Sequence, residues 1–76
     1  MDRILEMTTF VAVAEAQSFS AAAKKLGLSP PTVTRTVSAL EERVGARLLT
    51  RTTRSVRLTE AGLRFVDDAR RILHEI

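Results

Sequence analysis

Hydrophobic residues recur at three- and four-residue steps in the first part of the chain, and this spacing predicts an amphipathic helix. The series runs over residues 4–14, and Asp2 is placed to cap the helix that it defines. A polar break at 17–19 ends the series. A short second helix is expected over 20–26, capped by Ser20, and its alanines permit close packing against a neighbouring helix.

A turn that contains glycine joins this second helix to a third. Gly27 can adopt the positive φ that ends a helix, and Leu28 can fill the angle between the two helices. Ser29 is placed to cap a helix over 30–44, which opens on two prolines and ends at Gly45. One face of this third helix is apolar, and the others are short and polar. The apolar residues are Val33, Val37, Leu40 and Val44.

Two short β-capable runs follow, over 48–51 and 55–58, and the polar residues 52–54 between them predict a small hairpin. Thr59 is placed to cap a last helix that begins at Glu60. The apolar surface of this helix is too wide for one helix that leans on so small a core, so part of it is expected to meet a second subunit. The residues expected to form this dimer contact are Leu63, Val66, Ala69, Ile72, Leu73 and Ile76.

Together these elements predict a mainly α protein with a winged helix-turn-helix at 1–59, made of a three-helix core and a small β-hairpin wing. A C-terminal linker helix for dimerisation is expected at 60–76. In helix-turn-helix proteins the second helix of the motif lies in the DNA major groove. The predicted recognition helix is therefore the one that opens after Ser29, at about 30–44, and sequence-specific binding of double-stranded DNA is the leading functional hypothesis.

The basic residues are concentrated in the middle of the chain. Residues 16–59 contain eight lysines and arginines and two glutamates, a local charge of +6, whereas the two ends together carry −3. No acidic residue occurs between Arg43 and Thr59. A polyanion would approach this middle segment. A solvated charged surface without a partner is the less favoured interpretation.

The polar face of the recognition helix carries short hydroxyl side chains and an arginine, which suit the donors, acceptors and thymine methyls of the major groove. Thr32, Thr34 and Arg35 are the expected contacts near the start of the helix, with Thr36 and Ser38 further along. Arg35 could instead bind a phosphate. Each residue taken alone is also compatible with an ordinary exposed helix face, and it is the helix-turn-helix pattern that favours DNA contact.

Two prolines open the recognition helix and change what its N-terminus can do. Pro30 and Pro31 lack the backbone N–H groups that a helix N-terminus normally offers to an anion, so phosphate capture at this end is expected to be weak. Their rings can pack on thymine methyls or sugars. The alternative is that they only start the helix.

The predicted wing carries Arg51, Arg54 and Arg57, whose long side chains could follow the phosphate backbone or enter the neighbouring minor groove. These arginines are expected to supply affinity more than choice of sequence. A solvated hairpin is the alternative, and one of the three could instead pair with Glu41 or Glu42.

Residue types that serve catalysis or metal binding are scarce. His74 is the only histidine, cysteine is absent, and there is no nucleophile-elbow or phosphate-loop glycine pattern. Asp67 and Asp68 are adjacent on a helix and therefore diverge, which disfavours a metal pair. We predict no enzymatic activity and no metal or cofactor site.

The 76 residues make one small domain near the lower size limit for a self-sufficient core, which favours a partner subunit or a further domain. No apolar run approaches membrane-spanning length, and the N-terminus lacks the basic segment and apolar block of a secretory signal. We expect a soluble cytoplasmic protein without a membrane partner.

Two other functions fit parts of the pattern. The domain could dock another protein through its apolar C-terminal helix, with the basic surface incidental. Binding to RNA or single strands is disfavoured because tyrosine and tryptophan are absent and the three phenylalanines lie in apolar patterns.

An ordered series of residues extends along essentially the whole chain. It contains Phe10, Val13-Ala14-Glu15, Ser18-Phe19-Ser20, Ala22-Ala23, Leu26, Ser29, Pro31, Val33-Thr34-Arg35, Val37, Leu40-Glu41, Gly45, Leu48-Leu49, Arg51, Arg54 and Leu58-Thr59-Glu60-Ala61-Gly62. This series resembles the N-terminal DNA-binding domain of LysR-type transcriptional regulators. The resemblance implies a winged helix-turn-helix, a linker helix after Gly62 that pairs two subunits, and control of transcription at partly symmetric promoter sites.

The resemblance also assigns residues to the interface. It places Ser29, Pro30, Pro31, Thr32, Thr34 and Arg35 at the groove, and Arg51 and Arg54 on the wing. The chain departs from the family pattern at two positions. Pro30 stands where members often have glutamine, so a base-reading amide is missing and the family's sequence preference does not transfer. Leu49 stands where a phenylalanine is common and fills the same core less completely.

Members of this family normally continue into a larger domain that binds a small co-inducer, and these residues could not form it. A small-molecule effector is therefore expected to act only through that further domain. Full-length members commonly assemble as tetramers, whereas this piece is expected to stop at a homodimer through 60–76.

Overall fold

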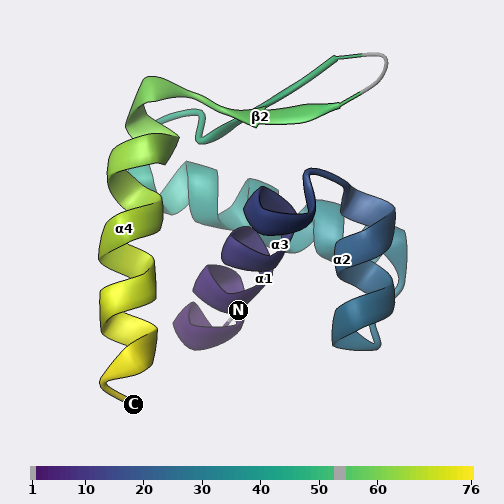
Figure 1. Cartoon of the computed structure of the whole chain (residues 1–76), viewed down its shortest axis with the longest axis horizontal. Helices are drawn as coiled ribbons and strands as arrows, with labels where there is room; N and C mark the ends of the chain where they lie inside the picture. The colour runs from purple at the N-terminus through teal and green to yellow at the C-terminus, as the bar shows by residue number, and fades with distance from the viewer. Residues whose placement is uncertain (1, 53–54) are drawn as a thin grey trace.

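Four helices and one β-hairpin make up the computed structural model, which describes residues 2–52 and 55–76 (Figure 1). Their order along the chain is that of the predicted winged helix-turn-helix followed by a C-terminal helix. The elements are α1 (Arg3–Ala16), α2 (Phe19–Leu26), α3 (Pro30–Val44), β1 (Leu49–Arg51), β2 (Val56–Leu58) and α4 (Glu60–His74).

Most helix ends lie where the sequence predicts them. Asp2, Ser29 and Thr59 each accept a hydrogen bond from a backbone N–H in the first turn of the helix that follows. Gly27 and Gly45 end α2 and α3 with φ of 70° and 80°, a left-handed conformation that glycine adopts without steric cost. These caps fix the lengths of the helices on both sides of the turn.

The second helix begins earlier than predicted. The Ser18 hydroxyl, not that of Ser20, accepts a hydrogen bond from the Ala21 N–H at 3.0 Å, so Phe19 is the first helical residue. Gln17 ends α1 with a left-handed φ of 55°. Both serines are chemically suited to capping, and the choice of Ser18 lets the phenylalanine that follows it pack against the core.

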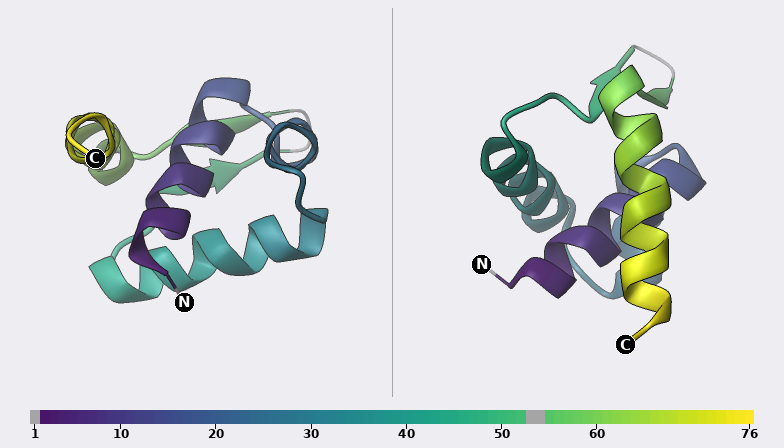
Figure 2. Two further views of the ribbon diagram at one scale, coloured as in Figure 1. Left: turned by 90° about the horizontal axis from the view of Figure 1, so that it is seen from below. Right: turned by 90° about the vertical axis from the view of Figure 1, so that its left-hand side faces the viewer.

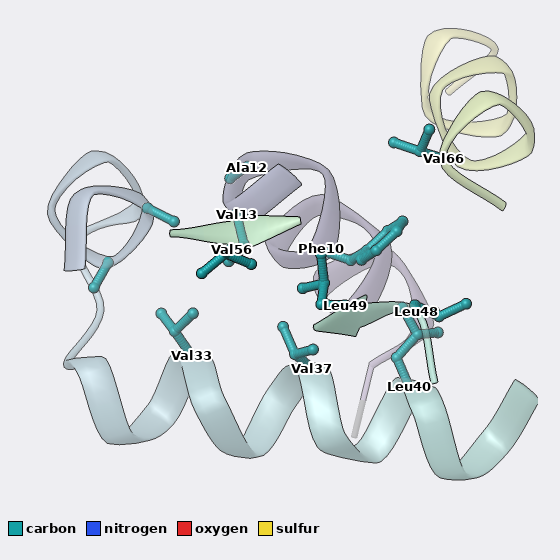
Figure 3. Packing of buried hydrophobic residues seen from close by; sticks show 12 residues of the cluster. Phe10, Ala12, Val13, Val33, Val37, Leu40, Leu48, Leu49, Val56 and Val66 are labelled. Carbon is teal, nitrogen blue, oxygen red and sulfur yellow. The ribbon is translucent and has the colours of Figure 1, made fainter. Parts of the chain in front are cut away.

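The first helix is the centre of the fold. It packs against α2, α3 and α4, and α3 and α4 lie along two edges of the molecule (Figures 1 and 2). Phe10 of α1 is fully buried and meets the ring of Phe65 edge to face, with 5.7 Å between the ring centroids. Val33, Val37 and Leu40 point from α3 into this core (Figure 3). The predicted apolar face of α3 is therefore correct at these three positions.

The fourth residue of that predicted face lies outside the core. Val44 is 40% exposed because the last turn of α3 extends to the rim of the packed region. It lines an open groove of about 420 Å³ between α1, α3 and α4. The apolar lining residues are Met7, Leu40, Val44, Phe65 and Ile72.

Two glutamates join segments that the apolar pattern does not connect. The carboxylate of Glu6 is buried and accepts hydrogen bonds from Arg43 at 3.1 and 3.3 Å, which links α1 to the end of α3. These hydrogen bonds and the negative charge of Glu6 raise the pKa of Arg43, so its guanidinium stays charged. The Glu41 carboxylate accepts from the backbone N–H groups of Leu48 and Leu49 at 2.8 and 3.1 Å, which ties α3 to the start of the hairpin.

The hairpin is antiparallel and confirms the predicted wing. Its paired residues are Leu49 with Leu58, Thr50 with Arg57, and Arg51 with Val56. Leu49 and Val56 are buried whereas Thr50 and Arg57 are exposed, as the alternation of side chains along a strand requires. Arg51 therefore lies on the face of the hairpin that turns toward the helices.

The last helix shares the core of the first three. Val66 and Ala69 are buried, and the C-terminal turns of α4 extend beyond α1 (Figures 1 and 2). Division of the chain into a domain at 1–59 and a linker at 60–76 remains a prediction. Within the described ranges 2–52 and 55–76, no helix has the length and apolar character needed to cross a membrane.

Replacement of Gly62 by alanine is expected to destabilise the fold. A Cβ at this position would collide with the backbone carbonyl of Leu48 and touch the side chain of Leu58. Because backbone cannot rotate away, we expect Gly62→Ala to lower the free energy of unfolding by about 1–3 kcal/mol. Urea titration measures this change. The exposed Arg64→Ala control in the same helix is expected to stay within about 0.5 kcal/mol of wild type, and an equal loss in both variants would contradict the steric explanation.

Candidate DNA interface

In the ribbon views no other helix or strand of the described residues lies across the outer side of α3 (Figure 2). Pro30, Pro31, Arg35 and Ser38 are exposed, and Thr34 is half-buried. The short polar face predicted for the recognition helix is therefore present on the molecular surface. Its side chains are small enough for this helix to enter a groove about as wide as an α-helix.

Thr36 does not belong to this face. Its side chain is fully buried, and its hydroxyl donates a 2.7 Å hydrogen bond to the carbonyl oxygen of Thr32 one turn earlier. The expectation that Thr36 contacts DNA is wrong. At about 100° per residue, position 36 lies beside the inward-pointing Val33 and Val37, and the threonine satisfies its hydroxyl within the helix while its methyl group packs.

The hydroxyl groups at the start of α3 hydrogen-bond to one another. Ser29 Oγ accepts from the Thr32 N–H at 3.3 Å and lies 2.8 Å from Thr32 Oγ1, which also accepts from Arg35 Nη2 at 3.4 Å. Ser29 is therefore engaged in capping the helix. The same network draws Arg35 toward the N-terminal end of the outer face, where Pro30 and Pro31 occupy the first two helical positions.

Arg51 connects the wing to the recognition helix. Its Nη2 donates a hydrogen bond to Thr34 Oγ1 at 3.1 Å, and its guanidinium carbon lies 3.8 Å from the centre of the Phe19 ring. A hollow of about 330 Å³ lies between α3 and the wing at this point. Besides these three residues it is lined by Val37, Ser38, Glu41, Arg47, Leu49 and Thr50.

The alternative in which a wing arginine pairs with Glu41 or Glu42 is not realised by the described arginines. Glu41 binds backbone N–H groups, and neither Arg51 nor Arg57 has a carboxylate of residues 2–52 or 55–76 within ion-pair distance. Arg54, which is predicted to bind DNA, and its neighbour Thr53 in the predicted turn lie outside the described residues.

Ion pairing divides most cations of the described residues into two groups. The arginines of α4 pair with acids: Arg64 with Glu60, Arg70 with Glu15 and Asp67, and Arg71 with Asp68. The cations of α2, of α3 and of the segment that contains the hairpin have no such partner within that part of the chain, apart from Arg43. They are Lys24, Lys25, Arg35, Arg47, Arg51 and Arg57. Positive charge is thus left unneutralised beside the hydroxyl-bearing face.

Two residues of this surface were not singled out from the sequence. Arg47 lines the hollow. Its position in the segment after Arg43, which has no acidic residue, is the one feature of the sequence that indicates a role in binding a polyanion. The Phe19 ring contacts the Arg51 guanidinium, although the apolar pattern around Phe19 predicts only a core residue. A contact between residues 32 positions apart leaves no mark in local spacing.

The residues expected to form a dimer contact separate into three groups on α4. Val66 and Ala69 are buried in the chain's own core, so the expectation that they meet a second subunit is wrong. Leu63 is 57% exposed but lies two and a half turns before Ile72, so the two side chains leave opposite sides of the helix. The remaining apolar surface is a continuous patch at the C-terminal end. It consists of the exposed Ile72 and Ile76 and the half-buried Leu73, and Ile72 lines the groove beside Val44.

The sequence is similar to those of known regulators. The HTH-type transcriptional regulator TfdT of Cupriavidus pinatubonensis is 50% identical over 70 residues, which are 92% of this chain and 31% of the relative. The HTH-type transcriptional activator AaeR of Escherichia coli is 45% identical over 76 residues, which are 100% of this chain and 25% of the relative. The chain thus spans about a third or less of the length of these curated relatives.

Solved structures of protein–DNA complexes have the same fold. The CbnR_DBD–DNA complex superposes with a TM-score of 0.92 at 47% identity, over 97% of this chain and 84% of that chain. The BenM_DBD/catB site 1 DNA complex superposes with a TM-score of 0.92 at 39% identity, over 99% of this chain and 83% of that chain. These neighbours identify the arrangement of helices and hairpin as a winged helix-turn-helix.

The match to a family model covers most of the chain. The model for the bacterial regulatory helix-turn-helix protein, lysR family, matches residues 4–63, from the start of α1 to the first turn of α4. The chain therefore belongs to the lysR family of bacterial regulatory helix-turn-helix proteins.

Proposed function

We propose that this chain binds double-stranded DNA in a sequence-specific manner, as the DNA-binding part of a LysR-type transcriptional regulator. One observation carries the proposal: the exposed, hydroxyl-bearing face of α3 lies beside Arg35, Arg47 and Arg51, cations that have no ion-pair partner among the described residues. The superposition on two protein–DNA complexes supports the same conclusion.

In this proposal α3 lies in the major groove and reads base edges. Thr34, Arg35 and Ser38 reach from its outer face, with Thr32 close to the N-terminal end. Arginine forms two hydrogen bonds with guanine, and a threonine methyl group packs on the methyl group of thymine. The preference for one DNA sequence therefore comes from the short hydroxyl side chains of α3 and from Arg35.

Pro30 and Pro31 make the start of α3 an apolar contact surface. Both rings are exposed, and neither residue offers a backbone N–H to a phosphate. The rings approach sugars or thymine methyls, so this end of the helix contributes shape rather than hydrogen bonds.

The cations of α2 and of the wing region hold the phosphate backbone. Arg47, Arg51 and Arg57 lie on or next to the wing, and Lys24 and Lys25 lie in the last turn of α2. Neutralisation of phosphates releases counterions, which gives affinity for every sequence and makes binding depend on salt.

A homodimer would place two recognition helices on one DNA site. The C-terminal patch of α4 supports this, since Ile72 is 46% and Ile76 76% exposed and the patch continues into the apolar groove beside Val44. Two copies related by a twofold axis match partly symmetric sites whose halves are about one helical turn, or a multiple of it, apart. Any small-molecule effector would act through a further domain.

We expect duplex affinity to fall steeply with salt. With about four phosphates contacted, the association constant should drop roughly a hundredfold between 50 and 200 mM salt. Arg57→Gln removes one unpaired cation and should lower the salt slope by about one. Fluorescence anisotropy titrations at four salt concentrations measure both effects.

The matched control is Arg71→Gln, which removes an arginine that is paired with Asp68 on α4. It should leave the salt slope unchanged. If the wild-type chain showed no duplex binding even at low salt, the proposal would be wrong and a protein-docking role for the domain would be favoured.

Selection of bound duplexes from a random pool should return a partly symmetric site. Arg35→Ala is expected to relax the preference at one position of each half-site, because one good arginine–guanine contact contributes about 1–3 kcal/mol of discrimination. Arg57→Ala, in contrast, should weaken binding without altering the selected sequence. An unchanged preference in Arg35→Ala would assign this arginine to a phosphate instead.

Dimer formation is expected to depend on the C-terminal patch. The double variant Ile72→Glu/Ile76→Glu places charges where two apolar side chains meet the partner, and should raise the dimer dissociation constant about a hundredfold or more. Sedimentation velocity over a range of concentrations measures the change. Leu63→Glu, on the opposite side of α4, is the control and should remain dimeric. A monomeric wild-type chain at high concentration, with and without DNA, would contradict the proposed dimer.

A further inference from the structure

We propose that Phe19 is a positioning residue for DNA binding, and that its ring and the Thr34 hydroxyl hold the Arg51 guanidinium ready to bind a phosphate. This inference rests on the function proposed above. It assigns to a residue of α2, which stands outside the predicted interface, a direct influence on how the wing meets DNA.

The geometry brings three elements together at one point. Phe19 is the first residue of α2, Thr34 is in the second turn of α3, and Arg51 ends β1. The guanidinium carbon lies 3.8 Å from the centre of the ring, and Nη2 lies 3.1 Å from Thr34 Oγ1. The strand register explains this approach, because Arg51 pairs with the buried Val56 and so faces the helices.

An aromatic platform orients this cation without neutralising it. No carboxylate of the described residues lies within ion-pair distance of Arg51, so its charge is held by a ring face and one hydroxyl oxygen. A carboxylate in the same place would compete with DNA phosphates. The ring does not, and a guanidinium has five N–H donors, of which the contact with Thr34 uses one.

Ordering Arg51 before DNA arrives reduces the cost of binding. A free arginine loses the freedom of several rotatable bonds when it contacts a phosphate, and an arginine already stacked on a ring loses less. A cation–π contact at an exposed site is strong enough to shift this balance by about three- to fivefold in affinity.

The contact also defines what Thr34 can offer to a base. Because Thr34 Oγ1 accepts from Arg51, its own hydroxyl hydrogen remains available for donation. Thr34 can then donate to base acceptors such as guanine O6 or N7, adenine N7 or thymine O4. The arginine of the wing and the reading of bases by α3 are coupled through this one oxygen.

A double-mutant cycle between Phe19 and Arg51 tests the proposal. Phe19→Leu keeps an apolar side chain against the core but removes the aromatic face, and is expected to weaken duplex binding about three- to fivefold. Phe19→Tyr keeps the aromatic face and should bind within about twofold of wild type. In the Arg51→Gln background, Phe19→Leu should cause no further loss, since the cation it positions is gone.

A merely structural role for Phe19 gives a different result. It would make the loss from Phe19→Leu equal in both backgrounds, and that result would overturn the proposal. Phe65→Leu, in which the other partly buried ring packed on the core is shortened, is the matched control. It should lower the thermal unfolding temperature without changing duplex affinity well below that temperature. Failure of the wild-type chain to bind duplex would instead refute the proposed function.

Nuclear magnetic resonance of the wild-type chain without DNA tests whether the Phe19 ring holds the Arg51 guanidinium. A guanidinium stacked on a ring face places the Arg51 side-chain protons in the shielding region of the ring. We therefore expect their resonances upfield of those of Arg57, the arginine in the paired strand, which has no ring contact among the described residues. If the Arg51 side-chain protons had the same chemical shifts as those of Arg57, the ring would not hold the guanidinium and the proposal would be overturned.

Discussion

The position of the recognition helix depends on how α3 is fixed along its inner side and at its end. Val33, Val37 and Leu40 insert into the core around α1, so rotation of α3 about its axis would expose apolar surface at a cost of about 25 cal/mol per Å². The Glu41 carboxylate then ties the last turns of α3 to the backbone N–H groups at the start of the hairpin. Because the inner side of α3 is packed and its end is bonded to the hairpin, the outer face of α3 keeps a fixed position and orientation relative to the wing.

Ion-paired arginines and cations without an acidic partner lie in different parts of this structure. In α4 and at the end of α3, arginines are paired with carboxylates, and the contact of Arg43 with the buried Glu6 links α1 to α3. Around the outer face of α3, the cations of the described residues have no acidic partner, although one of them, Arg51, is oriented by a ring and a hydroxyl. Unpaired cations beside small polar side chains suit a polyanion that is read by shape and by base edges.

Local patterns in the sequence predicted the elements well because each helix carries its own cap and apolar spacing. Ser29, Gly27 and Gly45 fix the ends of α2 and α3 within the helices themselves or next to them. The errors arose where tertiary packing chose between locally equivalent options. Ser18 and Ser20 are equally good caps, and Thr36, Val66 and Ala69 each lie on a face whose burial depends on the neighbouring helix. The contacts of Glu6, Glu41 and Phe19 join distant segments, and periodicity carries no information about them.

The claim that the outer face of α3 and the wing form the DNA interface is tested most directly by nuclear magnetic resonance titration of the chain with its selected duplex. We expect the largest amide shift changes from Thr32 to Ser38 and from Arg47 to Arg57. The exposed residues of α4 that face away from the apolar patch, Leu63 and Arg71 among them, should change little. Shift changes concentrated on α4, with α3 and the wing unaffected, would contradict the account.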